Sequence, residues 1–214
     1  MKTQKIGSVN RVAGNGVENS GEKKGKKSGI TIPKIIVQKA TILVVGTSPL
    51  ICNRNSQYGN PDAQQGRLDK ASAKGRSPEQ CMHDALYEIS PGRYGFPASA
   101  FKRALIEACT HSQNSYTKTF IRGAIQVVGG PLFEIKGSLP TMHKDTVRQN
   151  RVPAPRYRAQ FLVWSIEVPV LFTQTLDLEE VVYLFSLAGF HVGVGDKRPQ
   201  QGHGNGMFQV KAVS

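Results

Sequence analysis

The sequence is poor in aromatic residues and lacks long apolar runs. The first feature argues against a chain that folds along its whole length, and the second against a membrane-spanning protein. Aromatics make up 7% of the 214 residues, which is low for a chain that folds along its whole length. Part of the chain is therefore expected to lie outside any hydrophobic core. The longest apolar stretch, VVYLFSLAGF at 181–190, is too short for a bilayer span, which takes roughly 20 residues. A membrane-spanning protein is excluded, and no membrane is expected among its partners.

Cysteine is also scarce. Cys52, Cys81 and Cys109 are an odd number at wide spacing, which is not the pattern of a disulfide framework. The first residues, MKTQKIGSVN, place no apolar run after the lysines and so do not form a secretory signal. We expect reduced thiols and a cytoplasmic location.

Acidic residues are too few to balance the basic ones. Fifteen Asp and Glu face 28 Lys and Arg, which leaves a net charge of +13 and a pI near 9.9. Residues 1–40 hold nine basic and two acidic residues, and the remaining chain still carries +6, so the excess is not confined to one tail. Such a balance favours a polyanionic partner, because each neutralised phosphate releases counterions. Nucleic acid is the expected partner.

Composition divides the chain into an arm and a single domain with two insertions. Residues 1–29 contain six Gly and seven Lys or Arg with few apolar residues, which predicts a flexible basic arm. Residues 30–214 are expected to form one domain. The first insertion, 47–80, is polar and aperiodic. The second, 137–158, carries four arginines against the single acidic residue Asp145 and predicts a basic segment projecting from a β-hairpin.

The first half of the domain predicts a strand and two helices. A β-branched run predicts a strand over about 34–46, and a short helix is expected in 78–89. The stretch RYGFPASAFKRALIEACT predicts a longer helix, capped by Ser99, with one apolar face. The residues of that face are Phe101, Ala104, Leu105 and Ala108.

The second half predicts strands, a helix and a last strand. GAIQVVGGPLFEIKG and RAQFLVWSIEVPVLF are rich in strand formers, and the second alternates apolar residues from Leu162 to Val170 on the face of Trp164. DLEEVVYLFSLAG predicts a helix with Asp177 and Glu180 as a capping box and Gly189 as its end. GMFQVKAV closes the chain as a strand. The order predicts an α+β fold with a ferredoxin-like, RRM-like βαββαβ core.

A glycine-rich loop separates the last helix from the last strand. AGFHVGVGDKRPQQGHGNGMFQV holds six glycines within eighteen residues, with Lys197 and Arg198 at its centre. Glycines allow backbone amides to approach a phosphate closely. Dinucleotide and P-loop chemistry do not fit, because the loop follows a helix and contains no G-K-[ST].

Two of these segments resemble a known family. The ending of helix, glycine loop and strand resembles the C-terminal signature of the RAMP superfamily of CRISPR-associated proteins, and GFPASAFKRALIEA resembles its strand-to-first-helix stretch. SPLICNRN looks like the polar turn that these proteins place after the first strand. Among them the architecture is most similar to the backbone subunit that coats guide RNA.

The resemblance implies a function and a set of contacts. It implies an RNA-binding subunit that assembles head to tail along a guide RNA into a helical filament, with other effector subunits and a target strand as further partners. Residues 137–158 would form the projecting thumb. The expected RNA-binding residues are Lys102, Arg103, Arg148, Arg151, Arg156, Arg158, Gly193, Gly195, Lys197 and Arg198.

No residue pattern predicts catalysis, a metal or a cofactor. Cys81 and His83 form a C-x-H pair, as do Cys109 and His111, but structural zinc sites use other spacings. Five histidines leave open a RAMP-type endoribonuclease with a histidine acid or base: His83, His111, His143, His191 and His203. A basic single-strand-binding protein of phage or ribosomal type is the other alternative.

Overall fold

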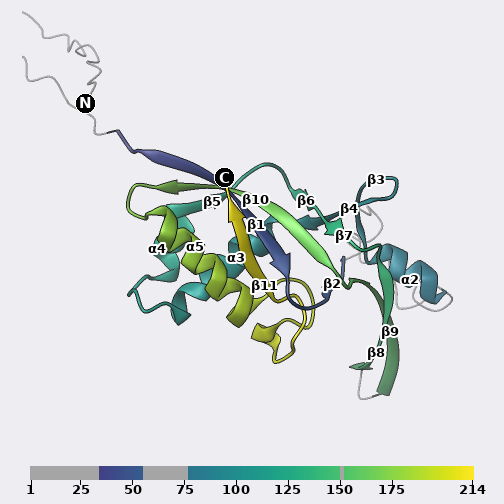
Figure 1. Cartoon of the computed structure of the whole chain (residues 1–214). Helices are drawn as coiled ribbons and strands as arrows, with labels where there is room; N and C mark the ends of the chain where they lie inside the picture. The colour runs from purple at the N-terminus through teal and green to yellow at the C-terminus, as the bar shows by residue number, and fades with distance from the viewer. Residues whose placement is uncertain (1–33, 55–76, 150–151) are drawn as a thin grey trace, which may run out of the picture. The chain divides into compact units, whose positions relative to one another are not determined.

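An antiparallel sheet in the order β11-β1-β10-β5 forms the centre of the structure (Figure 1). The structure is a computed structural model that describes residues 34–54, 77–149 and 152–214, of which Val37–Ser214 pack as one unit. The short strand β7 also pairs with β10. The strands of this sheet are β1 (Val37–Gly46), β5 (Ile125–Val127), β7 (Lys136–Gly137), β10 (Trp164–Thr173) and β11 (Phe208–Val213).

Alternation along the two central strands buries one face of the sheet. Ile42 and Val44 of β1 are fully buried, as are Ile166 and Val168 of β10. This period of two is the one expected for a half-covered strand. The prediction that Leu162 shares this face is wrong, because β10 begins at Trp164 and Leu162 lies before it, 53% exposed.

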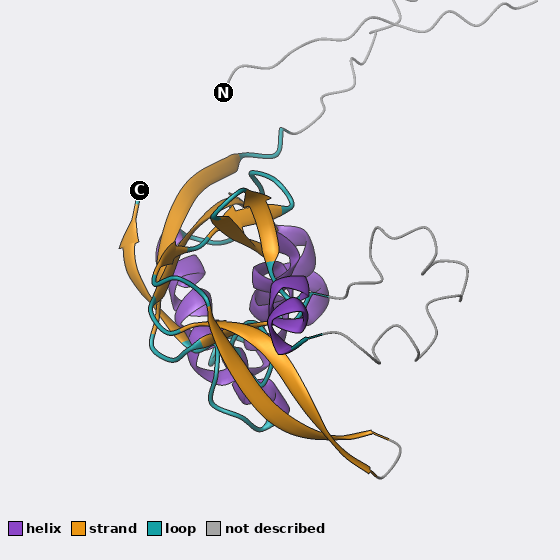
Figure 2. Ribbon diagram, turned by 90° about the vertical axis from the view of Figure 1, so that its right-hand side faces the viewer, coloured by secondary structure: helices purple, strands orange, loops and turns teal. Residues whose placement is uncertain are grey.

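Helices α3 (Ala98–Ala108) and α5 (Leu178–Leu187) pack against each other and cover the sheet (Figure 2). The capping box of Asp177 and Glu180 is confirmed at the start of α5. The prediction that Ser99 caps α3 is wrong. The N-cap is Pro97, whose ring presets the backbone angle but offers no acceptor, so no side chain caps this helix.

The last helix does not end at Gly189 as predicted. It continues into a π-helical turn, η2 (Ala188–Val192), and ends at Gly193. Gly189 instead allows a close approach to the sheet, because a Cβ there would lie 1.9 Å from the carbonyl oxygen of Phe208. This glycine serves helix-to-strand packing and not termination.

The basic segment forms a long β-hairpin that extends away from the central sheet (Figure 2). Strands β8 (Thr141–Gln149) and β9 (Val152–Phe161) pair along their whole length. The inner end of β9 also pairs with β2 (Leu50–Cys52), which gives a second sheet in the order β2-β9-β8. Helix α2 (Pro78–Asp84) packs against β9.

A third small sheet follows α2. Its order is β3-β4-β6, with β3 (Tyr87–Ser90), β4 (Arg93–Pro97) and β6 (Leu132–Glu134). The helix expected in 78–89 therefore stops at Asp84, and the rest of that segment joins β3. Three short helical segments complete the fold: η1 (Cys109–His111), α4 (Lys118–Ala124) and η3 (Pro199–Gln201).

Two predicted segments lie outside the described residues, namely the arm 1–29 and most of the first insertion, 55–76. Of that insertion, the described ends contain β2 and α2. Among the residues that are described, none of the helices combines the length and the apolar character needed to cross a lipid bilayer.

Candidate nucleic-acid interface

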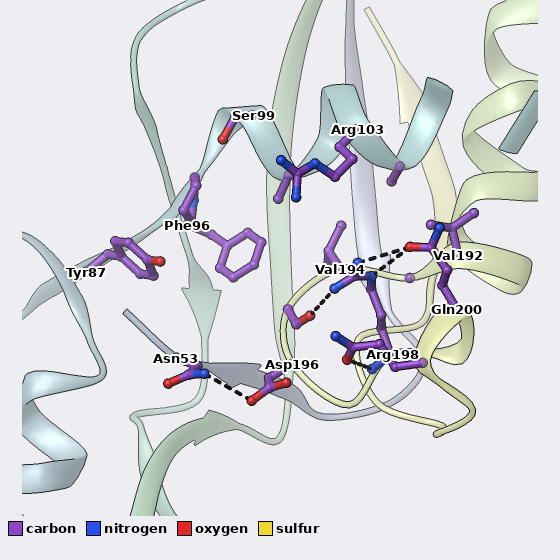
Figure 3. Close-up of a pocket in the computed structure, with 16 residues that line it drawn as sticks. Asn53, Tyr87, Phe96, Ser99, Arg103, Val192, Val194, Asp196, Arg198 and Gln200 are labelled. Atoms are coloured by element: carbon purple, nitrogen blue, oxygen red, sulfur yellow. Dashed lines mark hydrogen bonds between the residues drawn. The ribbon is translucent and has the colours of Figure 1, made fainter. Parts of the chain in front are cut away.

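A pocket of about 370 Å³ opens between the first turns of α3 and the glycine-rich loop (Figure 3). These two segments are about 90 residues apart in the chain, and they are the two that carry the family resemblance. The rest of the wall comes from the end of β2 and from strands β3 and β4. The lining side chains include Asn53, Tyr87, Phe96, Ser99, Arg103, Asp196, Arg198 and Gln200.

Arg103 supplies positive charge at the α3 side of this pocket. The side chain is exposed, and no hydrogen bond or ion pair holds it within the described part of the chain. The uncapped first turn of α3, with Ser99 and Ala100, lines the same space. The amide of Ala98 donates to the carbonyl oxygen of Pro131 over 2.9 Å, so the amides of Ser99 and Ala100 are the ones that a ligand could use. N–H groups at a helix start carry partial positive charge. An unpaired guanidinium beside them suits an anionic group.

Lys102, the neighbour of Arg103, points elsewhere. Its ammonium donates to the carbonyl oxygens of Ile121, Arg122 and Ile125, so it satisfies carbonyls at the end of α4. Partial burial lowers the pKa of Lys102, and the nearby charge of Arg122 acts in the same direction. Lys102, one of the predicted RNA-binding residues, thus contacts backbone carbonyls and does not line the pocket.

The glycine-rich loop is tightly packed against the rest of the domain and is not a free turn. Val192 and Val194 are buried. Gly206 has a φ of +68°, and a Cβ there would lie 1.7 Å from the carbonyl oxygen of Val194. The amide of Asp196 donates to the carbonyl of Ile51 over 3.0 Å, which ties the loop to β2.

Arg198 folds back on its own loop. Its guanidinium donates to the carbonyl oxygen of Gly195 over 3.1 Å and to Oε1 of Gln200 over 3.0 Å and 3.2 Å. Arg198, Gly193 and Gly195 all line the pocket, together with Arg103. Four of the predicted site residues thus meet in one place.

Lys197 turns away from the pocket toward the hairpin. Its ammonium lies 2.7 Å from Oδ2 of Asp145 on β8, and its backbone has a φ of +55°. The amide of Lys197 donates to Oδ1 of Asp196 over 3.0 Å. Lys197 thus combines a positive φ with an ion pair from its side chain to Asp145 and a hydrogen bond from its amide to Asp196.

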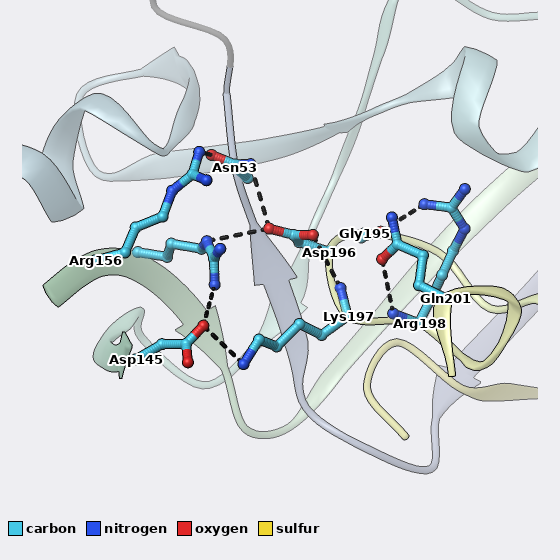
Figure 4. Close-up of polar contacts among 9 residues, drawn as sticks. Asn53, Asp145, Arg156, Gly195, Asp196, Lys197, Arg198 and Gln201 are labelled. Carbon is cyan, nitrogen blue, oxygen red and sulfur yellow. Dashed lines mark hydrogen bonds and ion pairs between the residues drawn. The ribbon is translucent and has the colours of Figure 1, made fainter. Parts of the chain in front are cut away.

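An ionic network around one buried arginine joins the hairpin to the loop (Figure 4). Arg158 of β9 is 4% exposed and is the one buried charged residue in the described ranges. Its Nη1 lies 2.9 Å from Oδ2 of Asp145, and its Nε lies 3.0 Å from Oδ2 of Asp196. Asn53 donates to Asp196 over 3.2 Å. Arg158, one of the predicted RNA-binding residues, is thus buried and paired with two carboxylates.

The electrostatic effect of this network is strongest at Asp145. The hydrogen bond from Lys197, followed by that from Arg158, lowers the pKa of Asp145 from 3.8 to about 2. The carboxylate therefore stays ionised at neutral pH and keeps both cations in place. The network sets the hairpin relative to the glycine-rich loop.

The other hairpin arginines are placed differently. Arg156 is exposed and donates to Oδ1 of Asn53 over 3.3 Å. Arg148 stands in β8 opposite Pro153, and Arg151 lies outside the described residues. Arg156 is thus the hairpin arginine with a described, accessible guanidinium.

The histidines and cysteines gather no metal site in the parts of the chain described here: no three potential ligands of the His, Cys, Asp and Glu types come together. Cys52 is buried, which raises the pKa of its thiol to about 12. His111 and His191, however, stack with ring centroids 4.3 Å apart, and sequence reasoning missed this pair. The π-turn that presents His191 has no recognised sequence signal.

Comparison with known proteins gives a similarity at the level of the fold. No protein-family model matches the sequence, and no curated protein matches it either. The fold is similar to a chain of the Type III-B Cmr-beta complex. That solved structure is described as bound to cognate target RNA. The TM-score is 0.50 at 9% sequence identity, and the alignment covers 83% of this chain and 60% of that chain.

At this identity the similarity concerns the fold. It agrees with the α+β architecture of antiparallel sheets that this chain has. The chain spans 60% of the length of the chain it matches, so segments of that chain have no counterpart here.

Proposed function

We propose that this protein is an RNA-binding, backbone-like subunit that assembles head to tail along a guide RNA in a CRISPR-type ribonucleoprotein. The observation that carries the proposal is the meeting of Arg103, the uncapped start of α3 and the glycine-rich loop around one pocket. These groups offer an anion an unpaired guanidinium, helix-end amides and glycines that admit close approach. A phosphate of single-stranded RNA fits this chemistry. No catalytic residue is assigned, and the location would be cytoplasmic.

The strand order supports a ferredoxin-like core as part of this proposal. In the order β11-β1-β10-β5 all neighbours are antiparallel, and α3 and α5 each lie between strands that are not adjacent in the sheet. This is the arrangement expected of a βαββαβ unit, with β1, β5, β10 and β11 as its four strands. Residues 30–214 would form this single domain, preceded by the basic arm 1–29.

The similarity to a chain of an RNA-bound effector complex supports RNA as the partner. The net charge of +13 agrees with it, because single-strand binding draws much of its free energy from phosphate contacts. Other effector subunits and a target strand are further proposed partners.

The RNA contact of the pocket is tested by removing its unpaired charge. In Arg103→Gln no described hydrogen bond is lost, so the melting temperature should stay within about 2 °C of wild type. Affinity for single-stranded RNA should fall by about 10-fold to about 150-fold, since a charge-assisted hydrogen bond contributes about 1.5–3 kcal/mol. The slope of log K against log salt should drop by about 0.7.

Arg122→Gln is the matched control, because Arg122 is also exposed but does not line the pocket. It removes the same charge from another part of the surface. Equal losses for the two variants, or none for Arg103→Gln, would contradict the pocket as the phosphate site. Fluorescence anisotropy with a labelled RNA oligonucleotide measures both quantities.

Head-to-tail assembly is proposed to use the hairpin, which reaches beyond the domain in Figure 2. Replacing residues 147–154 by an Asn-Gly turn between the paired residues Thr146 and Pro155 removes the outer hairpin and keeps Asp145 and Arg158. This variant should bind short RNA with unchanged affinity but form no regular multimers on long RNA in electron micrographs.

A second variant combines Arg148→Gln and Arg151→Gln, which keeps the full length of the hairpin but removes two of its positive charges. It distinguishes an effect of hairpin length from an effect of hairpin charge. Multimers that persist in this variant and vanish in the shortened one would support a bridging role. Unchanged multimers on the shortened hairpin would refute it.

A further inference from the structure

An exposed aromatic cluster lies beside the pocket, formed by the π-turn η2 and by the end of η1. His111 and His191 are both exposed, and their rings stack at an interplanar angle of 6°. Phe190 is 64% exposed and meets His191 edge to face, with ring centroids 5.0 Å apart. Phe190 thus makes its described ring contact with another exposed side chain and gains little hydrophobic stabilisation from burial. Its position is therefore not explained by the core.

The cluster is continuous with the pocket in two ways. The π-turn contributes His191 to the stack and Val192, the next residue, to the pocket wall. On α3, Ala100 and Ala104 line the pocket, and the same helix face continues toward His111 in η1. Seven residues separate Ala104 from His111, which is about 10 Å along a helix. The end of α3 and η1 thus carry the chain from the pocket wall to the histidine stack over that distance.

The local backbone also sets this place apart. η2 is a π-helical turn, a rare geometry that is frequently found at functional sites. The additional residue in the turn brings Phe190 and His191 to the surface while Val192 stays buried.

We propose that Phe190, His191 and His111 form a stacking platform for a base of the single-stranded RNA whose phosphate occupies the pocket. This inference rests on the function proposed above. Aromatic faces bind bases of any identity, because every base has a π-face. The pocket would hold the backbone by charge, and the platform would hold a base by stacking.

The test is a double-mutant cycle between the protein ring and the RNA base, done with the full chain. The probes are a labelled ten-nucleotide oligoadenylate and the same oligonucleotide with abasic residues throughout. Removing the bases should weaken binding to wild type by about 5-fold to about 100-fold. In Phe190→Ala the same removal should cost at least about 3-fold less, because the ring is already absent.

Three further variants sharpen the result. Phe190→Tyr should retain wild-type affinity, since it keeps an aromatic face. Phe190→Leu keeps apolar packing without a ring and should behave like Phe190→Ala, which covers the case that the alanine variant does not fold. Tyr183→Ala is the control, because Tyr183 is a 39% exposed aromatic on α5 that does not line the pocket. It should bind both probes like wild type.

The outcomes separate this inference from the function on which it rests. Wild type that binds neither probe at low salt would overturn both. A second outcome is that wild type binds both probes and Arg103→Gln lowers the salt dependence of binding, while Phe190→Ala and Phe190→Leu have no effect. That outcome would overturn the platform alone. RNA cleavage that His111→Ala or His191→Ala abolishes would also overturn it, because the pair would then serve acid and base chemistry.

Discussion

Arg158 offers the sharpest test of how the hairpin is anchored. The change Arg158→Met keeps a long unbranched side chain but removes a guanidinium that pairs with Asp145 at 2.9 Å and with Asp196 at 3.0 Å. Removing one partner of a buried ion pair costs about 3–5 kcal/mol, because the other charge stays buried and unpaired. Asp145 keeps Lys197, and Asp196 keeps Asn53, so the low end of that range is expected.

We therefore expect Arg158→Met to lower the free energy of unfolding by about 3 kcal/mol. For a unit of this size, that corresponds to a fall in melting temperature of about 6–12 °C. Thermal unfolding followed by circular dichroism measures it. Arg156→Met is the matched control, because Arg156 is exposed and makes one hydrogen bond of 3.3 Å. It should change stability by less than about 0.5 kcal/mol.

A double variant checks the cause of the loss. Asp145→Asn in the Arg158→Met background removes one of the stranded charges, so the two losses should not add, with a coupling of about 0.5–3 kcal/mol. If Arg158→Met melts like wild type, or if the two changes add fully, the network does not anchor the hairpin.

Three other predictions follow from described geometry. Gly206→Ala should lower the free energy of unfolding by more than about 2 kcal/mol in a urea titration, because φ is +68° and the new Cβ would clash with a carbonyl oxygen. Gly204→Ala is the control: its Cβ would lie in open space, so it should leave the stability unchanged. The depressed pKa of Asp145 contributes stability that is fully present above about pH 4 and is lost as pH falls through about 2. The difference in unfolding free energy between wild type and Asp145→Asn should therefore decrease between about pH 4 and about pH 2. With a pKa raised to about 12 by burial, Cys52 should resist iodoacetamide at pH 8 in the native protein, while the partly exposed Cys81 reacts, as mass spectrometry will show.

Helices and strands could be predicted from the sequence where a single periodicity or a capping residue determines them. The apolar face of α3, the capping box of α5 and the alternation along β10 are encoded within a few residues of each other. Net charge and the glycine-rich loop likewise indicated an anionic partner. Such features depend on short-range geometry, so they can be read without knowing the fold.

The roles of individual basic residues were decided only by the tertiary structure. Lys102 and Arg103 are neighbours in sequence, yet one binds carbonyl oxygens of α4 and the other faces the pocket, because successive helical residues point in different directions. Asp145 stands opposite Arg156 in the hairpin register but pairs diagonally with Arg158. Which cations remain available to an anionic partner thus depends on where distant carboxylates and carbonyls lie in the folded chain. No local pattern in the sequence contains that information.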